Sequence, residues 1–106
     1  MHAFDVLADP VRRRTLELLQ SGELSSGEVV EAIQLEFGIT QPAVSQHLKV
    51  LRDAGFVSST PQGSKRIYRI EKGAFYEIDR WLDGFRGFWE SKLDALGEDI
   101  AKQMDS

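Results

Sequence analysis

The segment from Thr40 to Leu51, TQPAVSQHLKVL, restricts the fold more than any other part of this chain. Its large apolar residues recur at the spacing of helical turns and form one stripe: Val44, Leu48 and Leu51. The Thr40 hydroxyl can accept a hydrogen bond from a free N–H of the first turn, and Pro42 fits that turn because no N–H is needed there. The segment therefore predicts a helix over about residues 41–54, ended by Gly55.

The other side of this predicted helix carries side chains of the kind that touch DNA. Ser and Gln can read base edges, whereas Lys and Arg hold phosphates. We expect these residues to take part in DNA binding: Thr40, Gln41, Pro42, Ser45, Gln46, His47, Lys49 and Arg52. Gln41, Ser45 and Gln46 are expected to face base edges, and Thr40, Lys49 and Arg52 the DNA backbone.

A β-hairpin is predicted directly after the helix, over about residues 56–70. The turn cluster PQGS separates a short strand that begins at Phe56 from the segment KRIYRI, in which basic and apolar residues are interleaved. The hairpin residues expected to contact or approach the phosphate backbone are Lys65, Arg66, Tyr68 and Arg69. Two helices joined by a turn and followed by such a hairpin form the winged helix-turn-helix plan.

Three further helices are predicted before the helix over residues 41–54, which is the recognition helix of this plan. A short helix over residues 3–8 carries Phe4 and Leu7. Asp9 and Pro10 start a helix that ends near Gln20. Ser25 and Glu28 form a capping box for the next helix, which ends near Gly38. With 106 residues and no repeats or linkers, the chain is expected to form a single, mainly α, winged helix domain with a two-stranded β-wing.

A long amphipathic helix is predicted over about residues 74–103. It holds more apolar surface than one small winged domain can bury, so it is expected to dimerise with a second copy. The alternative is an ordinary core helix that packs on its own domain. The expected interface residues are Phe4, Leu7, Phe75, Ile78, Trp81, Leu82, Phe85, Phe88, Trp89 and Leu93. Gly84 and Gly87 in this segment are open to two interpretations, close helix contact or a bend.

Charge is distributed unevenly along the chain, whose net charge is −4. Residues 41–72 hold six basic and two acidic side chains, while residues 1–40 hold three and seven and residues 73–106 hold four and eight. The positive segment coincides with the predicted recognition helix and wing. Because local charge matters more than net charge for phosphate binding, this pattern favours double-stranded DNA as the partner.

Three motifs of the chain resemble the ArsR family of bacterial transcriptional repressors: ADPVRR from Ala8, QPAVSQHLKVL from Gln41, and AGFV from Ala54. The resemblance runs from Phe4 to about Ile70. It implies a homodimeric repressor that binds a palindromic operator and leaves it when an effector binds. The stretch from Glu28 to Thr40 is about one helical turn longer than usual in the family. The chain has no cysteine, so the thiolate metal sites of metal-sensing members cannot be carried over.

Several residues allow more than one interpretation. His47 lies at the edge of the apolar stripe, where a packing or phosphate-contacting role fits better than base reading. Arg12 suits either a phosphate clamp or a structural ion pair. Asp79 and Asp83 could be drawn as a metal site, but such a pair usually forms a solvated face, and no metal or other cofactor is expected.

Other classes of function were weighed against DNA binding. An enzyme is not expected, because the only histidines are His2 and His47 and no nucleophile pairs with either. A winged domain that binds only proteins is the alternative, against which the basic wing argues. The chain shows no membrane span or signal-peptide pattern, which favours the cytoplasm. For control, two alternatives stay open: a small organic effector near Trp81 and Trp89, or no ligand at all.

Overall fold

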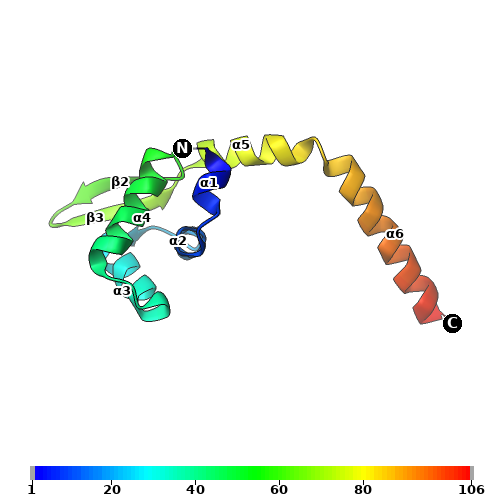
Figure 1. Ribbon diagram of the computed structural model, residues 1–106, viewed down its shortest axis with the longest axis horizontal. Helices are drawn as coiled ribbons and strands as arrows, with labels where there is room; N and C mark the ends of the chain where they lie inside the picture. Colours follow the sequence, from blue (N-terminus) through cyan, green and yellow to red (C-terminus); the bar gives the residue numbers. More distant parts are fainter. Residues whose placement is uncertain (1, 106) are drawn as a thin grey trace. The chain divides into compact units, whose positions relative to one another are not determined.

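Helices and a small sheet alternate in the computed structural model, which describes residues 2–105 apart from the side chains of residues 101, 102, 104 and 105. The elements follow one another along the chain as labelled in Figure 1: α1 (Ala3–Leu7), α2 (Pro10–Gln20), β1 (Leu24–Ser25), α3 (Ser26–Phe37), α4 (Gln41–Asp53), β2 (Val57–Gln62), β3 (Lys65–Ile70), α5 (Lys72–Asp83) and α6 (Arg86–Asp105). Residues up to Tyr76 form one unit, and residues from Glu77 onward form a second.

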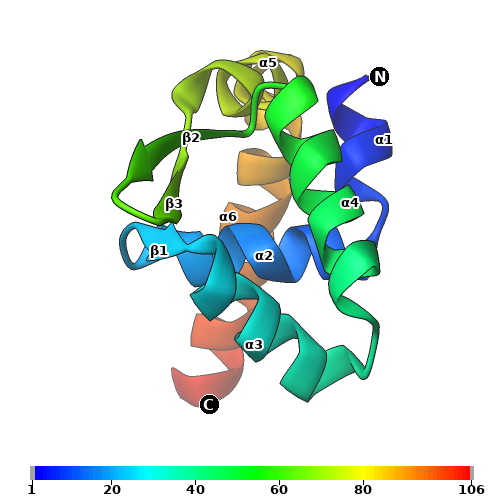
Figure 2. The ribbon, with the colours of Figure 1, turned by 90° about the vertical axis from the view of Figure 1, so that its left-hand side faces the viewer.

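Helices α2, α3 and α4 pack against one another in the first unit, and α2 and α3 also contact β3 (Figure 2). The most deeply buried large apolar side chains come from α1, α3, α4 and the residue before β2: Val6, Val29, Ile33, Val44, Leu51 and Phe56. The apolar stripe of α4 lies in this core, since Val44, Leu48 and Leu51 are at most 2% exposed. Burial of that stripe fixes which face of α4 is left for solvent.

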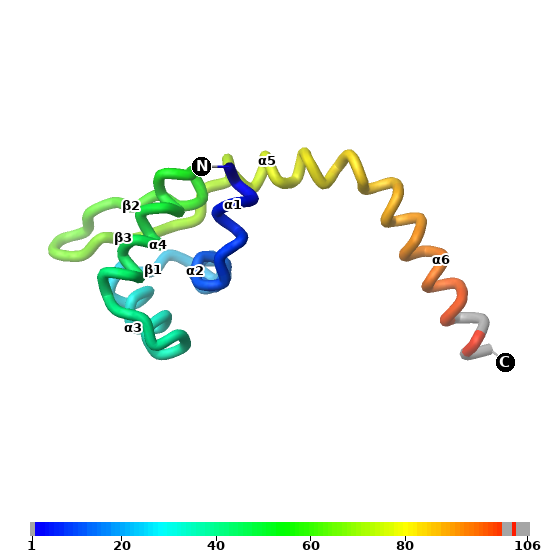
Figure 3. The backbone as a smooth tube through the Cα atoms, in the orientation of Figure 1, coloured from blue at the N-terminus to red at the C-terminus, as the bar shows by residue number. Residues whose placement is uncertain are grey.

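Local sequence signals set the ends of these helices. The Asp9 carboxylate accepts hydrogen bonds from the backbone N–H groups of Val11 and Arg12 at the start of α2. Ser25 and Glu28 form the expected capping box of α3, and Gly38 ends this helix with φ +67°. A short turn then leads into α4, as the tube in Figure 3 traces.

The recognition helix α4 begins and ends as its sequence predicts. The Thr40 hydroxyl accepts a hydrogen bond from the Ala43 N–H at 3.3 Å. At the other end Gly55 has φ +82°, and the Phe56 N–H donates to the Leu51 carbonyl at 2.9 Å. This bond pattern is a Schellman ending, which needs a left-handed residue that glycine supplies without strain. The chain is thereby turned from α4 directly into the wing.

The sheet has three antiparallel strands in the order β1–β3–β2. Strands β2 and β3 form the wing hairpin, with Val57 opposite Ile70 and Gln62 opposite Lys65 across a turn at Gly63. The sequence indicated only these two strands. The third strand, β1, pairs Leu24 with Tyr68 and Ser25 with Ile67, and it joins the wing to the start of α3.

The C-terminal segment contains two helices where the sequence analysis expects one over residues 74–103. Helix α5 ends at Asp83, Gly84 and Phe85 form a turn, and α6 begins at Arg86. Glycine lowers helix stability by about 1 kcal/mol relative to alanine, which favours a break at Gly84, although Gly87 and Gly97 remain within α6. Of the two interpretations of Gly84, the structure supports the bend.

Arg86 joins the two sides of this break. Its guanidinium donates to Asp83 at 2.9 Å and to Asp79 at 3.0 Å, and its pKa is raised by the charge of Asp79 and by the bond to Asp83. Asp79 and Asp83, the carboxylates considered above as a metal site, therefore bind the Arg86 guanidinium. Among the described residues, no group of three or more His, Cys, Asp or Glu side chains is placed to hold a metal.

Candidate nucleic-acid interface

The solvent face of α4 brings together most of the side chains that the sequence singles out. Gln41, Pro42, Ser45, Gln46, Lys49 and Arg52 are all exposed, because the opposite face of the helix is buried in the core. Within the part of the chain that the structure describes, neither Lys49 nor Arg52 forms an ion pair. The face therefore offers amides, a hydroxyl and uncompensated cations, which is the chemistry that reads bases and holds phosphates.

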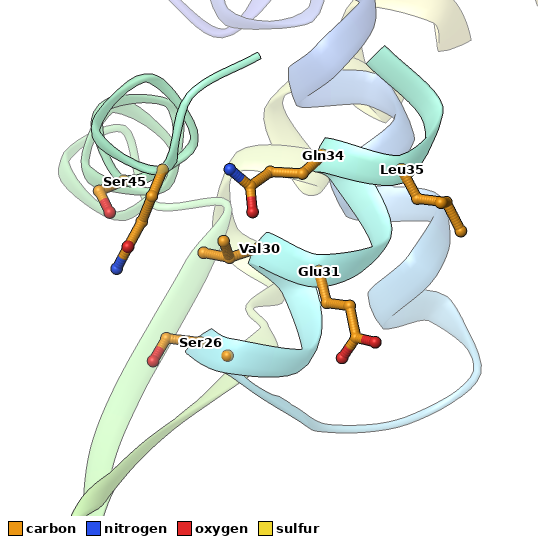
Figure 4. A pocket seen from close by; sticks show the side chains of 8 residues that line it. Ser26, Val30, Glu31, Gln34, Leu35 and Ser45 are labelled. Atoms are coloured by element: carbon orange, nitrogen blue, oxygen red, sulfur yellow. The ribbon is translucent and has the colours of Figure 1, made fainter. Parts of the chain in front are cut away.

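A groove of about 660 Å³ runs between α3 and α4, beside this face. Its walls include Ser26, Val30 and Gln34 from α3, and Gln41 and Ser45 from α4. Figure 4 shows Val30 and Gln34 pointing from α3 toward α4, whereas Leu35 points away from it. Ser26 is the first residue of α3, directly after the Ser25 cap, and no role was predicted for it.

His47 points toward the start of α2 and is half-buried. Its Nδ1 lies 3.9 Å from an Asp9 carboxylate oxygen and 3.4 Å from Nη1 of Arg12. Partial burial raises the pKa of Asp9, but backbone hydrogen bonds from Arg12 and Val11 and the nearby charges of His47 and Arg12 outweigh it, so this pKa is lowered. The placement agrees with a packing role for His47, and its contact with DNA stays a prediction.

Arg12 has a structural position. Its Nε donates to the Val6 carbonyl at 2.7 Å and its Nη2 to the Asp5 carbonyl at 3.1 Å. These bonds tie α2 to the carbonyl groups of α1, and Nη1 reaches His47 on α4. Of the two readings of this residue, the structural one fits, although carbonyl groups replace the carboxylate that was expected.

The wing presents its basic residues on two different faces, because successive residues of a strand point to opposite sides. Lys65 lies opposite Gln62 at the tip, and Arg66 donates from Nη1 to the Ser59 hydroxyl at 2.8 Å. Both residues are exposed and carry no ion pair among the described residues. Their contact with phosphates stays a prediction.

The other two wing residues are placed differently from the expectation. Tyr68 is only 6% exposed, because the central strand β3 turns it into the core, so the expected approach of its side chain to the DNA backbone is corrected. Arg69 donates to Glu23 at 2.9 Å and to the Thr60 hydroxyl at 3.1 Å. Its charge is already balanced by Glu23, and its contact with phosphate stays a prediction.

The chain is similar in sequence to known bacterial regulatory proteins. The family model described as "Bacterial regulatory protein, arsR family" matches residues 9–59, which include α2, α3 and α4. The HTH-type transcriptional regulator Rv2034 of Mycobacterium tuberculosis is 34% identical over 103 residues, covering 97% of this chain and 90% of that protein. The transcriptional repressor SdpR of Bacillus subtilis is 29% identical over 84 residues, covering 79% and 89%.

A solved structure agrees with these relatives. The crystal structure of the ArsR family transcriptional regulator RHA00566 superposes with a TM-score of 0.68 at 32% identity, covering 84% of this chain and 88% of that one. The winged helix fold, the exposed recognition face and the relatives lead to the same assignment. The chain belongs to the ArsR family and is a DNA-binding transcriptional regulator.

Proposed function

We propose that this regulator is a homodimeric repressor that binds a two-fold symmetric operator, and that it performs no catalysis. The observation that carries the proposal is the exposed face of α4, where Gln41, Ser45 and Gln46 lie beside the exposed cations Lys49 and Arg52. In this proposal α4 enters the major groove and its amides contact base edges. Lys65 and Arg66 at the wing hold the backbone.

Dimerisation is proposed from the exposed apolar residues of the second unit. Seven large side chains there are 47–68% exposed: Trp81, Phe85, Phe88, Trp89, Leu93, Leu96 and Ile100. Exposed apolar surface of this extent marks an interaction site, and two-fold dimers are the commonest oligomers. Two recognition helices related by a two-fold axis would read half-sites about 10 bp apart, or a multiple of that spacing.

Part of the expected interface belongs to the first unit and is less available. Phe75 is half-buried, and its ring packs edge-on against Phe56 with centroids 5.1 Å apart. Leu7 is also half-buried, whereas Phe4 is 37% exposed. We therefore assign the main dimer contacts to the residues that follow Tyr76.

The test is a footprint of the full chain on the DNA upstream of its own gene. The proposal expects a protected, two-fold symmetric site, and a complex whose mass corresponds to two protein chains per site. The relative SdpR is a transcriptional repressor, so we also expect the bound protein to lower transcription from the adjoining promoter in vitro. A protein that binds no DNA fragment better than random sequence, yet captures another protein, would support the winged interaction module instead.

A further inference from the structure

A second cavity lies within the first unit, away from the recognition face. It has a volume of about 560 Å³ and is bounded by α1, α2, the end of β3 and the start of α5. Its apolar wall consists of Leu7, Leu16, Ile70 and Phe75. Cavities of this size with mostly apolar walls are typical of sites for small molecules.

The rim of this cavity is positively charged. Arg13 and Lys72 line it, and both side chains are exposed. The Arg13 guanidinium is held in place by a 2.7 Å hydrogen bond from its Nη1 to the Leu7 carbonyl, the one bond of this group in the described structure. Its other N–H groups are therefore available to an acceptor.

The rim holds two basic residues, Arg13 and Lys72, and one acidic residue, Glu17. Glu17 lines the cavity, but its carboxylate already accepts a hydrogen bond from Arg14 at 3.1 Å. Helix α5 begins at Lys72 and has no acidic residue in its first turn, and Glu71, directly before it, accepts a hydrogen bond from the Ser58 hydroxyl. The cavity therefore combines an apolar interior with a cationic rim.

We propose that this cavity binds a small amphipathic carboxylate, with its hydrocarbon part against Leu16, Ile70 and Phe75 and its carboxylate on Arg13 and Lys72. A guanidinium can hold a carboxylate through two parallel hydrogen bonds, while a neutral or cationic head group leaves both cations unmatched. The proposal goes beyond the DNA-binding function and does not depend on it. It also places a ligand at a different position from the aromatic residues Trp81 and Trp89.

The experiment uses the full chain in the absence of DNA. The probe is sodium octanoate, added below the concentration at which it forms micelles. Isothermal calorimetry measures affinity, and methyl NMR of labelled Ile, Leu and Val residues locates the bound probe. We expect saturable binding, with the largest shifts at Leu7, Leu16 and Ile70. Octanol and octylamine share the tail but lack the anionic head, so each should bind at least about tenfold more weakly.

Two variants connect binding to the cavity. Changing both Arg13→Gln and Lys72→Gln should weaken octanoate about tenfold or more while leaving octanol unchanged. Gln20→Phe should abolish binding of both probes, because Gln20 is an exposed lining residue and a larger ring there fills the space. Lys92→Gln removes one positive charge from α6, outside the cavity, and should leave octanoate affinity unchanged.

Three outcomes would overturn the proposal. The first is no saturable binding of octanoate to the folded full chain, which would mean that the cavity is closed or already covered. The second is equal affinity for octanoate and octanol, which would remove the role of Arg13 and Lys72. The third is binding that persists in Gln20→Phe, with shifts confined to residues 77–100. None of these results bears on DNA binding, which the footprint tests separately.

Discussion

Gln46 is the residue whose replacement best separates base reading from simple attraction to DNA. It is exposed on α4, and a Gln amide can pair with the N6 and N7 edge of adenine. Gln46→Ala is expected to relax the preference at one base position of each half-site, at a cost of about 1–3 kcal/mol against the preferred base. Affinity for random DNA should be unchanged. Selection of operators from a random pool checks this, and an unaltered consensus would contradict the role.

Lys65 and Arg66 should behave in the opposite way, because phosphates carry no sequence information. Lys65→Ala and Arg66→Ala are each expected to weaken specific and random DNA about equally. Each lost phosphate contact should reduce the slope of log affinity against log salt by about 0.9. Binding isotherms over a range of salt concentrations measure this slope. A slope equal to that of the parent protein would show that the wing does not hold the backbone.

Asp9 is expected to stabilise α2 in a pH-dependent way. Asp9→Ala removes the acceptor for the Val11 and Arg12 N–H groups and should lower the unfolding free energy by about 1 kcal/mol. The pKa of Asp9 is lowered from its usual 3.8 in the folded protein. The part of its stabilisation that depends on charge is therefore fully present above about pH 3.8, and it is lost as the pH falls through the folded-state pKa. Urea unfolding of both proteins at several pH values measures the difference.

Two controls make this result specific. Asp9→Asn keeps a capping side chain but no charge, so it should cost less and its stability relative to Asp9→Ala should not fall in acid. Asp94→Ala removes an exposed carboxylate from α6 and should change stability by less than about 0.5 kcal/mol. A difference between Asp9→Ala and the parent that stays constant down to pH 2 would contradict the charge-dependent part.

At the scale of elements, helix ends are predictable where a residue acts through its own backbone neighbours. Thr40, Ser25 with Glu28, and Gly38 each form a cap from local bonds, so sequence alone predicts α3 and α4 closely. The face of a strand is harder to predict, because a shift of one residue exchanges the two faces. For this reason the burial of Tyr68 depends on how β3 pairs with β1 and β2, whereas the separation of Lys65 from Arg66 follows from alternation along the strand.

Contacts between distant residues explain what else the sequence could not predict. Strand β1 has two residues and exists because Leu24 and Ser25 pair with Tyr68 and Ile67 of β3. Arg12 and Arg69 are both cations in basic or mixed segments, and only the tertiary fold brings them to the Val6 carbonyl and to Glu23. Sequence therefore predicted which face of α4 is exposed, since that depends on one helix, and predicted the orientation of the wing side chains less well.

At the scale of the whole molecule, opposite charge is segregated along the chain. Residues 41–72 carry an excess of positive charge, and the segments before and after carry an excess of negative charge. A phosphate backbone attracts the first and repels the others, which limits the orientations in which the protein can approach DNA. The acidic C-terminal segment is consequently better suited to contact another protein surface than DNA, and its exposed apolar residues supply that surface.

Leu96 tests whether the apolar face of α6 holds two copies together. The side chain is 56% exposed, so Leu96→Glu should leave the fold of each chain intact. In a two-fold dimer the change occurs twice, and the loss of two buried leucines costs about 3 kcal/mol or more, which weakens dimerisation at least about 100-fold. Operator affinity should fall with it, because a symmetric site needs both recognition helices.

Ser91→Glu is the matched control, because it adds the same charge on the side of α6 away from Leu96. We expect the parent protein and Ser91→Glu to sediment as dimers at micromolar concentration, and Leu96→Glu to sediment as a monomer with unchanged helix content by circular dichroism. A Leu96→Glu variant that remains dimeric would place the interface elsewhere. A parent protein that sediments as a monomer would contradict dimerisation itself, and with it the expectation of a two-fold operator.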